Sequence, residues 1–257
     1  MTLKNMRAND LYLHSLILHG NNKLLDYIDD DGNAFRYSQF NTRAVIDCPC
    51  RSKGCEVVCY ATKGNHVFPS VKKSRERSFV DSQRGDFADA MIYTIRTEKT
   101  SARYKNATMI IRIHESGDFY SVQYLKKWVK VWAETKNDDG VVYVFYTKSF
   151  PFFLMLTDDE KKVINDGMNS GRIAMNLSID DTTTPEQWKA YFEMKRAFPS
   201  ANTYRVTEHT TANDDVCDCA NCAKCGACNA SKNGHKVVVI HSASENDKKV
   251  YRANSNK

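Results

Sequence analysis

The sequence lacks the apolar segments that carry a chain into or across a membrane. Its N-terminus, MTLKNMRANDLYLHSL, has no apolar run of the kind that forms a signal peptide. No stretch elsewhere approaches the roughly 20 apolar residues that span a bilayer. We therefore expect a soluble, cytoplasmic protein with no membrane partner. In that compartment thiols stay reduced, so disulfides are not expected.

Cysteine is absent from residues 60–216, although the chain of 257 residues contains nine. Cysteines used only as small core residues would be scattered along the chain. The nine instead form two clusters: Cys48, Cys50, Cys55 and Cys59, and then Cys217, Cys219, Cys222, Cys225 and Cys228. Clustered thiols in a reducing compartment predict metal binding.

The second cluster contains C-x₂-C-x₂-C-x₂-C, from Cys219 to Cys228. Ferredoxin-type iron–sulfur segments use a nearly identical run, and the small intervening residues let the backbone approach a cluster. This favours a [4Fe–4S] cluster over zinc, whose cysteine pairs are usually separated by a longer loop. Zinc and a redox-active thiol patch remain alternatives. The first cluster has a structural zinc knuckle as its alternative, and the two clusters could also form one shared site.

Positive charge is concentrated just after the first cluster. The chain has 37 Lys and Arg against 31 Asp and Glu, and residues 51–105 alone hold 12 against 6. The basic side chains of segment 71–77 are candidates for binding phosphate, on a nucleic acid or a small ligand: Lys72, Lys73, Arg75 and Arg77. The alternative is a solvated helix face.

Apolar periodicity predicts strands that alternate with helices. The expected strands are 43–47, 109–120 (ending in a glycine turn), 141–149, 172–180, 203–207 and 235–242, and the expected helices are 70–99, 121–136, 156–171 and 184–198. This order predicts an α/β fold whose five or six units form a partial or full barrel. The expected divisions are an N-terminal extension (1–42), the barrel-like domain (43–210), a cysteine-rich metal-binding segment with the last strand (211–243) and a flexible tail (244–257).

Polar residues follow the expected strands, where the chemistry of such barrels gathers. His114, Glu115 and Asp118 follow the second strand and are candidates to move a proton or bind a cofactor amine. Alternatively, they only cap the turn and the next helix. Tyr60 and Lys148 are expected at the same end of the barrel, and both are candidate cofactor-binding residues.

A cysteine cluster after the first strand, followed by the turn Ser116-Gly117-Asp118 after the second, resembles the radical S-adenosylmethionine barrel enzymes. The resemblance implies that Cys50, Cys55 and Cys59 hold a [4Fe–4S] cluster whose remaining iron binds S-adenosylmethionine. It also implies that the Ser116–Asp118 turn contacts the cofactor's amino group. Both intervals of Cys50-x₄-Cys55-x₃-Cys59 are one residue longer than in that superfamily's motif.

A second resemblance covers most of residues 43–230. Segments 48–78, 111–128 and 144–149, with the C-terminal cysteine cluster, resemble the gene product 88 family of phage and plasmid proteins. It implies a phage or mobile-element origin, hence the host cytoplasm, and brings no known activity with it.

The leading hypothesis is an iron–sulfur protein with one or two [4Fe–4S] clusters and radical chemistry on an unknown substrate. Cys48 would either be a fourth ligand, which leaves no iron open for a cofactor, or a thiol close to the cluster. The alternatives are a non-catalytic nucleic-acid-binding protein stabilised by zinc or iron–sulfur, and a redox sensor with one cluster. The sequence makes no prediction of oligomeric state.

Overall fold

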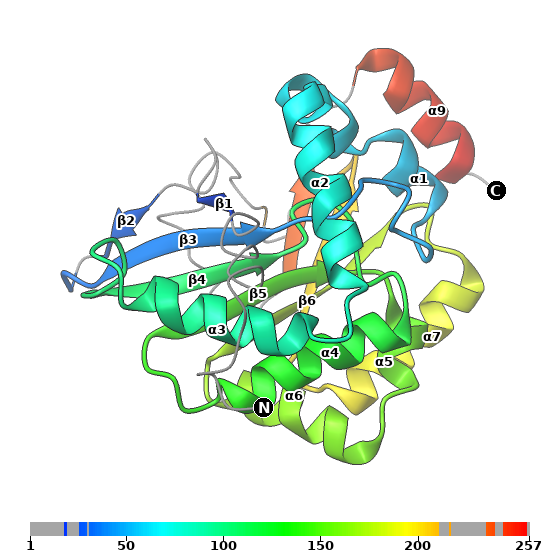
Figure 1. The fold of residues 1–257 in the computed structure, drawn as a ribbon. Helices are drawn as coiled ribbons and strands as arrows, with labels where there is room; N and C mark the ends of the chain where they lie inside the picture. The colour runs from blue at the N-terminus through cyan, green and yellow to red at the C-terminus, as the bar shows by residue number, and fades with distance from the viewer. Residues whose placement is uncertain are drawn as a thin grey trace.

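Six parallel strands in the order of the chain form the centre of the protein (Figure 1). The computed structural model describes residues 18–19, 26–29, 31–210, 216, 235–239 and 244–255. The parallel strands are β3 (Ala34–Phe40), β4 (Ala107–Ile113), β5 (Val141–Thr147), β6 (Ile173–Asp180), β7 (Asn202–Thr207) and β8 (His235–Val239). Two short strands, β1 (Leu18–His19) and β2 (Tyr27–Ile28), pair antiparallel with β3. The sheet curls into a half-barrel, which confirms the expected α/β architecture of about six units.

Helices cover the convex face of the sheet (Figure 1). They are α3 (Phe87–Lys99), α4 (Val122–Glu134), α5 (Phe150–Leu154), α6 (Asp158–Asn169) and α7 (Pro185–Ala197). The main core lies between these helices and the sheet, and the buried Trp128 and Trp132 belong to it. Three helices begin as the sequence predicts, because Ser121, Thr157 and Thr184 accept backbone N–H groups at their N-termini.

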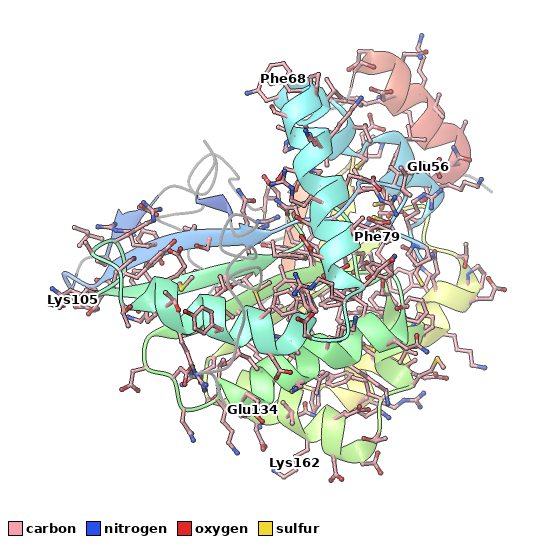
Figure 2. All side chains as sticks on the ribbon, in the orientation of Figure 1. Glu56, Phe68, Phe79, Lys105, Glu134 and Lys162 are labelled. Carbon is pink, nitrogen blue, oxygen red and sulfur yellow. The ribbon has the colours of Figure 1, made fainter. Side chains whose placement is uncertain are left out.

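The remaining helices gather at the carboxyl ends of the strands. They are α1 (Lys53–Val57), the 3₁₀ turns η3 (Tyr60–Thr62) and η4 (Gly64–Val67), α2 (Pro69–Ser82) and α9 (Glu245–Ser255). Figure 2 shows Lys105 at the amino end of the strands and Glu56, in α1, at the opposite end. Polar side chains that follow the strands are therefore brought together beneath α1 and α9, which pack against each other.

The predicted strand 43–47 is wrong. The first parallel strand is β3, which ends at Phe40 and lies within the expected N-terminal extension. Residues 44–47 form a turn, in which Val45 has a φ of 66° and Ile46 is 70% exposed. Arg43 closes this turn by donating to the Asp47 carboxylate at 2.7 Å, and a closed turn excludes strand pairing.

The predicted helix 70–99 is two helices, separated by residues 83–86. The break is stabilised by Lys127, whose ammonium donates to the carbonyl oxygens of Ser82 and Arg84 at 2.8 Å each. The segment 244–257, expected to be a flexible tail, contains α9, whose Tyr251 is 1% exposed. None of the described helices is long and apolar enough to cross a membrane.

Candidate functional site

The loop that carries the first cysteine cluster is fixed to the turn after β4. The Thr42 N–H donates to the Ser116 carbonyl at 2.9 Å, and the Ser116 hydroxyl donates back to the Thr42 carbonyl at 2.8 Å. Farther along, the Asp118 N–H donates to the Asp47 carbonyl at 3.1 Å. The thiols that follow Asp47 are therefore held beside the Ser116–Asp118 turn, as the sequence predicts.

Gly117 is required in this turn for two reasons. Its φ is +86°, a backbone conformation that L side chains rarely adopt. A Cβ at this position would also lie 2.0 Å from the Thr42 hydroxyl oxygen. The glycine thus lets the two loops meet at backbone distance.

Helix α1 holds Cys55 at the carboxyl end of β6. Ser52 begins the helix by accepting the Cys55 N–H at 3.2 Å, and its hydroxyl donates to Asp180. The Gly54 N–H donates to the Thr182 hydroxyl at 2.7 Å, so α1 is joined to the loop after β6. These contacts span 128 residues of sequence, and no local pattern identifies Ser52 or Thr182.

The four cysteines of the first cluster form no disulfide and are half-buried. Burial raises the pKa of Cys50 to about 11, with a contribution from the charge of Asp118. Burial also raises the pKa of Cys55 to about 11, although the Lys148 ammonium opposes it. The pKa values of Cys48 and Cys59 are raised by burial too. Cys48 lies near enough to Cys55 and Cys59 for their charges to interact.

Asp118 places a carboxylate beside these thiols. It accepts the Thr147 hydroxyl at 2.8 Å and the backbone N–H groups of Lys148 and Phe119 at 2.9 and 2.7 Å. Burial raises its pKa, while these hydrogen bonds lower it. Its position is thus defined by donors from the turns after two neighbouring strands.

Lys148 and Asp180 form an ion pair at the same edge, with 2.7 Å between ammonium nitrogen and carboxylate oxygen. Their side chains are only 10% and 2% exposed. Although burial raises the pKa of Asp180, Lys148 and the hydroxyl donors hold it below its usual value. The structure therefore places the Lys148 ammonium at the carboxyl ends of the strands, where its charge opposes the effect of burial on the pKa of Cys55.

His114 and Glu115 face different surroundings. His114 has a φ of 63°, is 3% exposed and packs against Phe119, with its Nε2 2.9 Å from the Tyr124 hydroxyl. Burial lowers its pKa to about 3, so it is neutral and directed into the core. Tyr60 donates to the Glu115 carbonyl at 2.5 Å, which joins the cysteine loop to the end of β4.

The basic segment lies on α2. Lys72 and Lys73 are exposed, Arg77 is half-buried and Arg75 is 5% exposed. The Arg75 guanidinium donates to the Ala61 carbonyl at 3.1 Å and lies 2.6 Å from the His66 Nδ1. Arg75 therefore supports the loop after the thiols, whereas the two lysines face outward.

The first cluster offers four thiols, the kind of donor that an iron–sulfur group requires. Four sulfur ligands share one edge, and a bound cation reverses the effect of burial on thiol pKa. Among the described residues, no group of three or more His, Cys, Asp or Glu side chains is placed to hold a metal ion. The second cluster, Cys217 to Cys228, lies outside the described residues.

One hollow in the described part of the chain lies elsewhere. It has a volume of about 160 Å³ and is lined by residues such as Met168, Ala174 and Asn202. Ala174 and Asn202 lie at the amino ends of β6 and β7, opposite the thiols, and Met168 lies in α6. The hollow contains no thiol or acidic side chain, and it forms no part of the candidate site.

The fold and this edge define an α/β half-barrel protein with a thiol-rich site where its strands end. The family described as Gene product 88 matches residues 15–231, and the chain belongs to this family. It is 27% identical to the Gene 88 protein of Mycobacterium phage D29 over 170 residues, and this alignment covers 61% of this chain and 67% of the relative. Identity to the Gene 88 protein of Mycobacterium phage L5 is also 27%, over 191 residues, 67% of this chain and 73% of the relative. No solved structure matches significantly.

Proposed function

We propose that this protein is an iron–sulfur enzyme that binds S-adenosylmethionine at the carboxyl edge of its half-barrel. The observation that carries the proposal is the position of the thiols. The loop after the first parallel strand brings Cys50, Cys55 and Cys59 to the edge, and hydrogen bonds fix that loop to the glycine turn after the second strand. The radical S-adenosylmethionine enzymes, which the sequence resembles, use the same two loops.

In this proposal Cys50, Cys55 and Cys59 would hold a [4Fe–4S] cluster, which would supply an electron for reductive chemistry on S-adenosylmethionine. The backbone of Ser116 and Gly117 would contact the amino group of that cofactor. The carboxylate of Asp118, held by Thr147 and the Lys148 N–H, keeps this turn in place.

The other residues of the edge have supporting roles. Lys148 supplies positive charge beside Cys55, which favours the thiolate that a metal requires. Tyr60 fixes the cysteine loop through Glu115. His114 serves the core rather than proton transfer, because both its contacts and its lowered pKa belong to a buried neutral ring.

Iron and acid-labile sulfide should be measured on protein purified without oxygen. We expect about four irons per chain from each cubane, with matching sulfide. Replacement of Cys50, Cys55 or Cys59 by Ala should remove one cluster. Cys48→Ala should leave that cluster in place if one of its irons has no cysteine ligand. Bound zinc without sulfide would refute the proposal. Where the cluster is present, S-adenosylmethionine should change its electron paramagnetic resonance spectrum, and no change would refute cofactor binding.

The second cysteine cluster is tested in the same preparation. We propose that Cys217, Cys219, Cys222, Cys225 and Cys228 provide the ligands of an auxiliary cluster. Their replacement by Ala should halve the iron content and leave the response to S-adenosylmethionine unchanged. Loss of all iron would show instead that both groups share one site.

Nucleic-acid binding by a zinc- or iron–sulfur-stabilised protein is the second candidate. It is favoured by Lys72 and Lys73, which are neighbours on the exposed side of α2. Binding that weakens steeply with salt, and that weakens further in a Lys72→Gln, Lys73→Gln variant, would support it.

A further inference from the structure

The concave face of the half-barrel has a polar centre, in contrast to the apolar convex face. Strand register places Gln39 beside Arg112, and Tyr146 beside Asn176. Tyr204 lies two strands farther, beside Ser178. In a filled barrel this face would hold branched apolar side chains. Here apolar residues of the concave face, such as Ile110 and Val144, form only a small cluster.

Arg112 is a charged residue of β4 on this face. Its Nε is buried and has no hydrogen-bond partner. Its guanidinium carbon lies 4.8 Å from the centre of the Tyr146 ring. Within the described part of the chain, its guanidinium has no hydrogen bond and no ion pair. The buried Arg75 and the half-buried Arg172 differ, because both donate to backbone carbonyls.

The surroundings keep Arg112 charged without pairing it. Burial acts to lower its pKa, but the oxygens of Tyr60, Tyr146 and Glu115 raise it above its usual value. Arg112 is half-buried, and a cation that is partly removed from water without a hydrogen-bonded partner lowers the stability of the folded protein. A protein can keep such an unpaired charge where the charge binds a ligand. The five N–H groups of a guanidinium lie in one plane and suit the oxygens of a carboxylate or phosphate.

We propose that Arg112 binds the carboxylate or phosphate of a small ligand on the concave face. Tyr146 and Tyr204, whose ring centres lie 4.7 Å apart at an angle of 76°, form an aromatic wall next to it. This wall suits a ligand with a planar or apolar body attached to the oxyanion. The site goes beyond the function proposed above, because it depends on Arg112 and not on a metal at the thiols.

Binding should be measured by calorimetry on the full chain, with sodium benzoate and sodium phosphate as separate probes. We expect saturable binding of at least one probe, at least about tenfold weaker in Arg112→Met. Stronger benzoate binding would identify a carboxylate on an aromatic body, and stronger phosphate binding a phosphorylated ligand. Arg96→Met is the matched control, since Arg96 pairs with Asp138 on the helical side, and it should bind as the unchanged protein does.

Stability without added probe gives an independent readout. Because Arg112→Met removes a half-buried charge that has no hydrogen-bonded partner, its thermal midpoint should equal or exceed that of the unchanged protein. A structural arginine would give the opposite result. Arg112→Lys keeps the charge but loses the planar set of N–H donors. This variant should therefore fold, and it should bind the probe more weakly than the unchanged protein does. The proposal is overturned if neither probe binds saturably, or if binding is unchanged in both Arg112 variants.

Discussion

Substitution of Gly117 by Ala tests how the thiol loop is held in place. The new methyl group would lie 2.0 Å from the Thr42 hydroxyl oxygen and 3.2 Å from the Thr42 carbonyl carbon. The φ of +86° is an additional cost for any L residue. We expect Gly117→Ala to destabilise the protein by two separate effects, one from the backbone and one from the contact.

The two effects can be estimated. A left-handed conformation costs an L residue roughly 1–2 kcal/mol. Forcing extra atoms into a well-packed region costs about 1–3 kcal/mol more. The free energy of unfolding should therefore fall by roughly 2–5 kcal/mol, as measured by guanidinium chloride titration. Thr42→Ala in the same chain should recover part of the contact cost, because it removes the nearest atom and the Thr42 hydroxyl has no hydrogen-bond partner in the described part of the chain.

Gly32 provides the control, since its φ is +83° and a Cβ there would meet nothing within 4 Å. Gly32→Ala should show the backbone cost alone, roughly 1–2 kcal/mol. The reasoning is wrong if Gly117→Ala costs no more than Gly32→Ala, or if Thr42→Ala rescues nothing. In either case the two loops would be able to separate without loss of stability.

Three further predictions concern buried groups. Asp180→Asn should lower the free energy of unfolding by roughly 3–5 kcal/mol at neutral pH, because it leaves Lys148 buried without a counter-charge; a loss below about 1 kcal/mol in denaturant titration would contradict this. In the unchanged protein that contribution is present above the ordinary carboxyl pKa of about 4 and is lost as the pH falls through the lowered pKa of Asp180. Burial lowers the pKa of His114 to about 3, so protonation favours the unfolded chain as the pH falls below about 6.5, by roughly 3 kcal/mol near pH 4. His114→Gln should make the free energy of unfolding less dependent on pH in this range. An unchanged slope in unfolding titrations would show that other groups cause the dependence. Tyr251→Ala should speed hydrogen exchange in α1 and α9, because the Tyr251 ring packs on Gly54; Val250→Ala, at a side chain 43% exposed, should not.

The fold was predictable where local sequence pattern and burial agree. The strands from β4 to β7 are buried on the convex face and carry apolar runs, and the helices between them begin at capping residues such as Ser121 and Thr157. This alternation was sufficient to predict the parallel sheet and to bring Cys50, Gly117 and Lys148 to one edge. Their common location follows from strand direction alone.

The errors arose where tertiary contacts override the local pattern. Segment 43–47 contains Val45 and Ile46, which favour a strand, yet the ion pair of Arg43 with Asp47 closes a turn instead. The contacts of Ser52 and Lys148 with Asp180 were likewise beyond reach, because each joins residues that are distant in sequence. No spacing rule predicts which hydroxyl will meet which carboxylate across a sheet.

Arg112 shows that a departure from pattern can itself be informative. In the run MIIRI it is the only charged residue of a buried strand, and a sequence that specifies a core would place an apolar residue there. Such conflicts between local sequence and burial are expected at functional sites, where stability is sacrificed for binding. The register brings this exception to the concave face, beside Gln39 and near Tyr146. A ligand held there would lie on the strand that also ends in the Ser116–Asp118 turn, so β4 would connect the oxyanion site to the thiols.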